Sequence, residues 1–144
     1  MFEIFSGKKI IVTGNTGFKG TWLSLWLLKS GAQVCGISLN ESAKNSLPDV
    51  KQFLGDICDK AFLQETILSV KPDFIFHLAA QPLVPYAVEN PYETFNTNVI
   101  GTLNLLEIIR EYNSPCVAIF VTSDKCYAPL DTSTGYVETD KLGG

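Results

Sequence analysis

Five short apolar stretches lie along the chain, and none of them alternates between apolar and polar residues. We predict strands over residues 8–13, 33–38, 50–54, 73–79 and 116–122. Continuous apolar strands separated by helical patterns are typical of a parallel sheet with both faces covered. Right-handed crossovers then give an α/β fold with a doubly wound, Rossmann-like sheet. After Ser123 the sequence has the residue types of a loop and no further strand or helix pattern, so we expect this sheet to be incomplete at its C-terminal end.

Helical spacing predicts three helices: residues 18–30, a helix capped by Asp59 that ends before Pro72, and residues 91–112. In the first helix, four large apolar side chains share one face, which we expect to be well covered: Phe18, Trp22, Leu25 and Trp26. The third helix has Asn90 as a candidate cap and Pro91 at its first position. Its apolar positions are Phe95, Val99, Leu103, Leu106 and Ile109.

Composition narrows the class of protein. With 144 residues, 46% hydrophobic and 18% charged, the chain is one domain and is neither disordered nor fibrous. A net charge of −4 without a basic run disfavours nucleic acid or an anionic membrane as a partner. No apolar run approaches the length of a membrane span, and the N-terminus does not resemble a signal peptide. These features predict a cytoplasmic protein.

Cysteine and histidine are too few and too scattered to predict a metal site. Cys35, Cys58, Cys116 and Cys126 form no Cys-x-x-Cys pair, and His77 is the single histidine. We expect free, buried thiols in a reducing compartment. Because His77 lies in an apolar strand, we favour a hydrogen-bonded core histidine over a catalytic one.

A glycine-rich turn joins the first predicted strand to the first helix. Such a turn needs glycine for the tight bend, for backbone approach to a pyrophosphate, and for close packing of helix on strand. The unpaired amides at the helix start would face the phosphates, with the helix dipole behind them. The candidate residues are Gly14, Asn15, Thr16, Gly17, Phe18, Lys19 and Gly20.

Further cofactor contacts are expected where the later strands end. The second strand lacks the usual acidic residue for a ribose hydroxyl, so Ser38, Asn40 or Glu41 could substitute for it. No arginine is present there for a 2′-phosphate, although Lys44 follows a few residues on, so NAD is favoured over NADP. Asp56 and the adjacent Ile57 follow the third strand, and Asp56 could accept from the adenine amino group. Small side chains close the fourth strand and would let a cofactor lie against the backbone: Leu78, Ala79 and Ala80.

Five motifs together resemble the CDP-glucose 4,6-dehydratases of the extended short-chain dehydrogenase/reductase family of NAD-dependent epimerases and dehydratases. They are G-x-T-G-F-K-G, W-L-S-L-W-L-L, F-H-L-A-A-Q-P-L-V, E-T-F-x-T-N-V-x-G-T and V-T-S-D-K-C-Y. The resemblance covers less than half of a full-length member. It implies that residues 1–144 are the N-terminal part of an NAD-binding Rossmann domain, without the substrate domain. It also implies a nucleotide-sugar substrate, with CDP-glucose favoured, and a homo-oligomer at full length.

The resemblance assigns chemistry to the residues after the fifth strand. In such enzymes NAD oxidises carbon 4 of the sugar, water is eliminated across carbons 5 and 6, and the hydride returns to carbon 6. By resemblance Ser123 hydrogen-bonds the carbon 4 oxygen, Asp124 protonates the leaving hydroxyl, and Lys125 takes the carbon 5 proton. Thr97 matches a residue near the cofactor, and Thr122 is a further candidate cofactor contact.

The sequence also departs from the family pattern. The family needs a Tyr-x-x-x-Lys pair, and none of the five tyrosines here has a lysine four residues on. We therefore expect this 144-residue chain to be inactive by itself. Asn15 replaces a common histidine, which bears on substrate choice. Two alternatives stay open: another NAD-dependent nucleotide-sugar dehydratase or epimerase, and a truncated NAD-binding module without catalysis.

Overall fold

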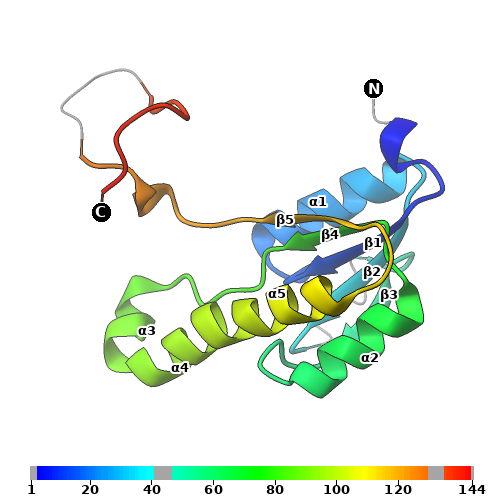
Figure 1. The fold of residues 1–144 in the computed structure, drawn as a ribbon, viewed down its shortest axis with the longest axis horizontal. Coiled ribbons are helices and arrows are strands. Elements are labelled where there is room, and N and C mark those ends of the chain that lie inside the picture. Colours follow the sequence, from blue (N-terminus) through cyan, green and yellow to red (C-terminus); the bar gives the residue numbers. More distant parts are fainter. Residues whose placement is uncertain (1–2, 41–46, 130–134, 144) are drawn as a thin grey trace.

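A five-stranded parallel sheet with the order β3-β2-β1-β4-β5 forms the centre of the protein in a computed structural model (Figure 1). The structure describes residues 3–40, 47–129 and 135–143. The strands are β1 (Lys9–Thr13), β2 (Gln33–Ser38), β3 (Lys51–Leu54), β4 (Phe74–His77) and β5 (Val117–Phe120). The predicted α/β class and all five strands are confirmed, although most strands are shorter than predicted.

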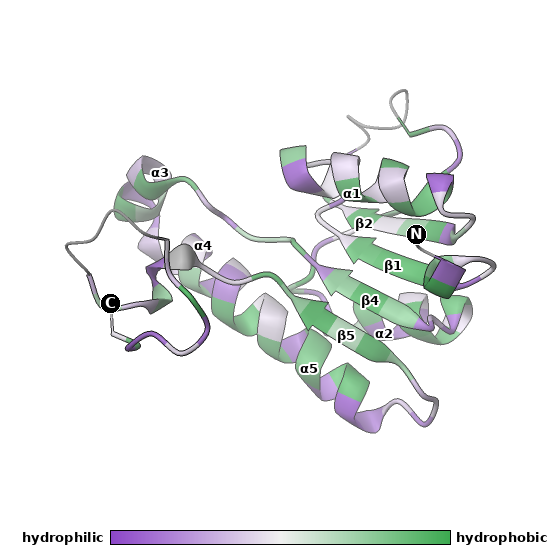
Figure 2. Ribbon diagram, turned by 90° about the horizontal axis from the view of Figure 1, so that it is seen from above, coloured by the Kyte–Doolittle hydropathy of each residue, from purple (hydrophilic) through white to green (hydrophobic). Residues whose placement is uncertain are grey.

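Helices cover the two faces of the sheet unequally (Figure 2). On one face α1 (Phe18–Lys29) packs over β1 and β2. On the other lie α2 (Lys60–Val70) and α5 (Thr102–Glu111). Each face has its own apolar core: Leu63, Ile67 and Leu105 belong to the α2–α5 side, and Leu27 and Leu47 to the α1 side. The strand β5 lies at the sheet edge, and the side chains of Val117 and Ile119 are half exposed.

The predicted covering of α1 is wrong. Phe18 is 81% exposed and Trp22 is 64% exposed, so the large apolar face points to solvent. The helix instead buries a narrow face of Gly20, Ser24 and Leu27 against the sheet. Small side chains on this face let α1 approach the sheet closely, which large aromatic side chains would prevent.

The single helix predicted over residues 91–112 is three consecutive elements: α4 (Pro91–Phe95), a π-helical turn (Asn96–Gly101) and α5. A short helix that we did not predict, α3 (Val84–Glu89), precedes them. Asn90 is the N-cap residue of α4, but its side chain does not cap, contrary to our expectation. The predicted apolar stripe is largely exposed, because Gly101, Leu105 and Ile108 are the buried positions. In contrast, Asp59 caps α2 as predicted: its Oδ1 accepts from the amide of Phe62 at 3.0 Å.

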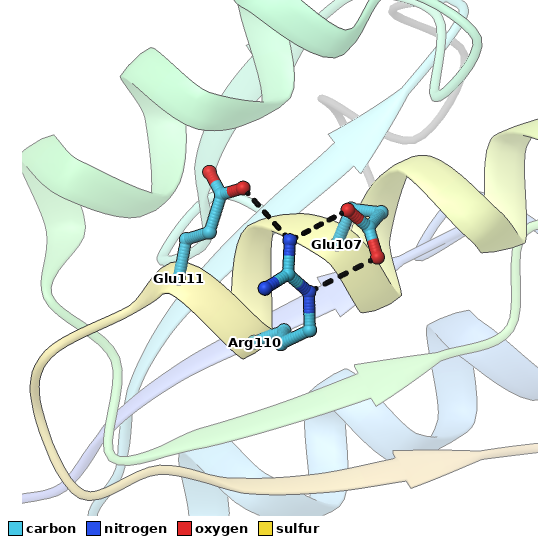
Figure 3. A network of polar contacts seen from close by, with 3 residues as sticks. All are labelled: Glu107, Arg110 and Glu111. Atoms are coloured by element: carbon cyan, nitrogen blue, oxygen red, sulfur yellow. Dashed lines mark hydrogen bonds and ion pairs between the residues drawn. The ribbon is translucent and has the colours of Figure 1, made fainter.

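Three charged side chains contact one another near the C-terminal end of α5 (Figure 3). The Arg110 guanidinium donates to both carboxylate oxygens of Glu107, at 3.1 and 2.9 Å, and to Glu111 at 3.0 Å. These contacts lower the pKa of Glu107 and raise that of Arg110. Because all three side chains are exposed, the cluster adds little to stability.

The four cysteines are free, but only Cys35 is buried, so our expectation of four buried thiols is wrong. Burial raises the pKa of the Cys35 thiol. After β5 the chain leaves the sheet and makes a 3₁₀ turn (Asp124–Cys126), and Tyr127 then stacks on Tyr136 with ring centroids 5.0 Å apart. Within the part of the chain that the structure describes, each helix is too short or too polar to span a bilayer.

Candidate functional site

A cavity of about 600 Å³ opens where the parallel strands end at their carboxyl side. Ligands of open α/β sheets bind at this edge. All the predicted cofactor contacts except Asn15 line it: Gly14, Thr16, Gly17, Phe18, Lys19, Gly20, Ser38, Asp56, Ile57, Leu78, Ala79, Ala80, Thr97 and Thr122. The structure thus brings residues from six separate segments together around one space.

Asn40, one of the candidates for contacting the ribose, also lines the cavity. Five further lining residues were not among the predicted contacts: Ile37, Leu39, Gly55, Pro82 and Val121. Each is next to, or two residues from, a predicted contact in the sequence. They could have been predicted by including both sequence neighbours of each residue chosen at a strand end, because ligands of open α/β sheets bind where the strands end.

The glycines of the turn have separate structural roles. Gly14 has a φ of +69°, and a Cβ there would lie 2.8 Å from the amide nitrogen of Ala79. A Cβ on Gly20 would lie 2.1 Å from the carbonyl oxygen of Gly14, so α1 can approach the turn only if this residue is glycine. Gly17 is less constrained, because its Cβ would lie 3.3 Å from the same oxygen. Gly17 is the N-cap residue of α1 and faces the cavity.

The start of α1 is suited to an anion. The N-cap residue Gly17 has no side chain to accept from the first amides, and the first turn of the helix holds no acidic residue. The first amides of a helix have no partner within the helix, and the helix dipole places partial positive charge there. Lys19 adds a full positive charge to the same wall. A phosphate group fits this end of the cavity.

Asn15 lies outside the cavity, fully buried beneath the turn. Its Nδ2 donates to Oε1 of Gln52 at 3.0 Å. The side chain fills the space above Gly36, where a Cβ would lie 2.2 Å from it. Asn15 therefore connects the turn to β2 and β3.

The cavity wall at the end of β2 combines the apolar Ile37 and Leu39 with the uncharged polar Ser38 and Asn40. The Ser38 hydroxyl donates to the carbonyl of Asn40 at 2.9 Å, which leaves its oxygen able to accept. Asp56 lines the cavity, and its Oδ1 accepts from the amide of Cys58 at 2.8 Å. Glu41 and Lys44, the other candidates for contacting the ribose or its phosphate, lie outside the described residues.

His77 is a buried, hydrogen-bonded histidine beneath the cavity floor, as we favoured. The Thr13 hydroxyl oxygen accepts from the amides of Leu78 and Ala79, at 3.2 and 3.1 Å, so its hydrogen points to His77 Nδ1 at 2.7 Å. The Thr102 hydroxyl donates to the carbonyl of Asn98 at 2.8 Å, so its oxygen accepts from His77 Nε2 at 3.1 Å. This network fixes the tautomer that carries hydrogen on Nε2.

Protonation of His77 would break this network. A second ring hydrogen would face Thr13, whose oxygen already accepts two amides. Burial lowers the pKa of His77 to about 4. In its neutral form the ring therefore holds β1, β4 and the first residue of α5 together, and it is not placed as a proton donor.

We expect the free energy of unfolding to fall as the pH is lowered from about 6.5 to about 4. In this range the unfolded chain binds a proton on His77 that the folded protein excludes, so acid favours unfolding, by no more than about 3 kcal/mol. Urea titrations of the natural protein and of His77→Gln across this range measure the effect. If the free energy of unfolding depended on pH equally in the two proteins, the role given to His77 would be contradicted.

The π-helical turn positions the far wall of the cavity. Asn98 holds the loop after β4 with two hydrogen bonds: its Oδ1 accepts from the amide of Gln81 at 2.8 Å, and its Nδ2 donates to the Gln81 carbonyl at 3.0 Å. Thr97, the preceding residue, lines the cavity. A π turn carries one extra residue per turn, which changes the facing of the residues in it.

The predicted catalytic residues follow Thr122 directly, at the end of β5. Ser123 and Lys125 are exposed and do not line the cavity themselves. The Ser123 Oγ accepts from the amide of Lys125 at 3.0 Å and caps the 3₁₀ turn, so its hydrogen can still be donated. Asp124 belongs to this turn, and its side chain lies outside the described part of the structure.

Comparison with known proteins agrees with this arrangement. The family model described as GDP-mannose 4,6 dehydratase matches residues 11–143. CDP-glucose 4,6-dehydratase of Salmonella typhimurium is 42% identical over 99% of this chain and 42% of its own length. CDP-paratose 2-epimerase of Salmonella typhi is 35% identical over 94% of this chain and 44% of its own. The chain thus spans less than half the length of these relatives.

Solved structures show the same fold. UDP-glucose 4-epimerase of Thermus thermophilus, in complex with NAD, superimposes with a TM-score of 0.81 at 29% identity. The match covers 93% of this chain and 44% of that one. The UDP-Glc/GlcNAc 4-epimerase of Campylobacter jejuni gives a TM-score of 0.84 at 25% identity over 95% of this chain and 43% of that one.

Proposed function

The chain belongs to the family described as GDP-mannose 4,6 dehydratase, among the NAD-dependent nucleotide-sugar epimerases and dehydratases, and we propose that it supplies the dinucleotide site of a CDP-glucose 4,6-dehydratase. One observation carries this proposal: Thr122 lines the cavity, and Ser123, Asp124 and Lys125 follow it directly in the chain. The carboxyl end of β5 thereby joins a dinucleotide-sized space to three groups able to donate or accept protons.

The cavity suits NAD. The first amides of α1 and Lys19 would hold the pyrophosphate, and Asp56 would accept from the adenine amino group. Small side chains at Ala79 and Ala80 would leave room for a flat ring against the backbone. Bound NAD would supply transient oxidation of the sugar at carbon 4, which acidifies the proton on carbon 5.

The residues after β5 would then donate and accept the protons that move during the dehydration. Ser123 would donate to the oxygen on carbon 4, using the hydrogen that its cap leaves available. Lys125 would take the proton from carbon 5. Asp124 would give a proton to the hydroxyl leaving carbon 6, so that water departs as the carbon–carbon double bond forms.

A substrate panel tests the proposal. We expect the natural protein that carries this sequence to convert CDP-glucose faster than UDP-glucose or GDP-mannose, with appearance of the 4-keto product as the measurement. Faster turnover of another nucleotide sugar would favour a different dehydratase or an epimerase, which CDP-paratose 2-epimerase among the relatives represents.

A further inference from the structure

Among the described residues, three side chains carry a buried polar atom without a hydrogen-bond partner. The atoms are Oδ1 of Asn15, Nε2 of Gln52 and Oγ of Ser24. Such atoms are rare in folded proteins, and each costs free energy because it has lost its contact with water. Two of the three belong to one hydrogen-bonded pair, in which Nδ2 of Asn15 donates to Oε1 of Gln52 at 3.0 Å. The pair therefore contributes little to stability, which points to another role.

The pair spans β2, and a glycine in that strand makes room for it. Gly36 of β2 is the register partner of Gln52 in β3. A Cβ on Gly36 would lie 2.2 Å from Nδ2 of Asn15, so the Asn15 amide occupies the place that a side chain would take. Asn15 thereby reaches across the bare backbone of β2 to the next strand.

The backbone of Asn15 is held at the start of α1. The Thr21 hydroxyl donates to the Asn15 carbonyl at 3.2 Å. The residues that follow Asn15 in the turn line the cavity: Thr16, Gly17, Phe18 and Lys19. The bond between Asn15 and Gln52 thus ties this lining segment to β3 from the side away from the cavity.

We propose that Asn15 and Gln52 are positioning residues, which hold the turn in the shape that binds the pyrophosphate of a dinucleotide. The proposal rests on the dinucleotide role proposed above for the cavity. A glycine-rich turn has wide conformational freedom, and ordering it during binding would lower the affinity. Hydrogen bonds from amides to a phosphate also weaken when their distance or angle departs from the optimum. A pair that fixes the turn beforehand avoids both losses without touching the ligand.

Stability and phosphate affinity should respond differently to loss of the pair. Asn15→Leu or Gln52→Met alone leaves the other amide buried without its partner, so each should lower the urea midpoint of unfolding. The double variant replaces both amides by apolar side chains of similar size and should restore the midpoint. Affinity for the pyrophosphate should not recover, because no hydrogen bond then ties the turn to β3. For a merely structural pair, affinity would follow stability.

Titration calorimetry with adenosine and with ADP separates the phosphates from the rest of the nucleotide. In the cofactor-free natural protein, we expect each single variant and the double variant to lower the ADP affinity about tenfold, as does loss of one hydrogen bond to a charged group. Adenosine affinity should stay unchanged. The losses should not add in the double variant, because both residues act through one bond. Gln52→Met leaves the turn sequence intact, so it tests the proposal even if Asn15→Leu does not fold.

Ser24→Ala is the matched control. Ser24 is as fully buried as Asn15 and carries the third unpartnered atom, but it lies within α1 and outside the turn. This variant should raise the urea midpoint and leave both affinities unchanged. ADP affinity at natural strength in the folded double variant overturns the proposal, and so does an equal loss of adenosine affinity. A natural protein that binds neither nucleotide would contradict the dinucleotide site itself, and the positioning role with it.

Discussion

Replacing Gly20 by alanine is expected to abolish NAD binding and to lower the free energy of unfolding by about 3 kcal/mol, near the upper end of the cost of overpacking. The new Cβ would lie 2.1 Å from the carbonyl oxygen of Gly14, and a backbone atom cannot move aside as a flexible side chain can. Helix propensity alone predicts the opposite sign, a gain of about 1 kcal/mol for alanine over glycine. The steric term is larger, so the turn and the start of α1 must separate.

Two further glycines serve as comparisons for this prediction. Gly17→Ala keeps the fold, because its Cβ meets Gly14 at 3.3 Å, but it places a methyl group where a phosphate would approach. The Cβ added by Gly135→Ala would meet nothing within 4 Å, so this variant should change neither NAD binding nor the free energy of unfolding. Urea unfolding and NAD titration of the natural protein and the three variants measure both effects. NAD binding by Gly20→Ala at natural strength would refute the role given to this turn.

Replacing Lys125 by methionine is expected to lower the rate of product formation by about 10² to 10⁴, the usual contribution of a general base. Methionine keeps the length of the side chain and removes its capacity to take a proton. The step that should fail is removal of the proton from carbon 5 of the sugar. Exchange of that position with deuterium from the solvent should be lost along with product formation.

Lys141→Met is the matched control for this variant, because Lys141 is also an exposed lysine after β5. It should leave the rate and the exchange unchanged. NAD binding should be the same for both variants, since neither lysine lines the cavity. Deuterium exchange at the natural rate in Lys125→Met would assign the base to another residue.

Local signals were enough to predict the cofactor end of the molecule. The glycine turn lies between a strand and a helix that are close in sequence, so its position could be predicted from residues 9–29, although Gly14 is also constrained by Ala79. The lining residues that follow the later strands could be predicted from one topological rule, because every parallel strand ends at the same edge of the sheet. Thr97 lies in the π-helical turn instead and was assigned from the family resemblance. Asn15 shows the limit of this reasoning: membership in the turn does not tell whether a side chain points into the cavity or beneath it.

Helix orientation and irregular turns could not be predicted in this way. Periodicity identified an apolar face on α1, but the face that packs inward is chosen by how closely Gly20 and Ser24 let the helix approach. Spacing also treats residues 91–112 as one continuous helix, whereas the π-helical turn at Asn96–Gly101 shifts the facing of everything after it. Asn98 in the turn accepts from the amide of Gln81, and His77 bonds to Thr102 directly after the turn. No local pattern encodes these tertiary hydrogen bonds.

The most direct test of the dehydratase proposal is the product that the natural protein forms from CDP-glucose in D₂O. The proposal predicts a 4-keto-6-deoxy sugar nucleotide that has lost one water and carries deuterium at carbon 5, identified by mass spectrometry and NMR. A sugar nucleotide of unchanged composition would contradict it and indicate an epimerase. NAD binding without any product would contradict it as well and leave only a dinucleotide-binding role.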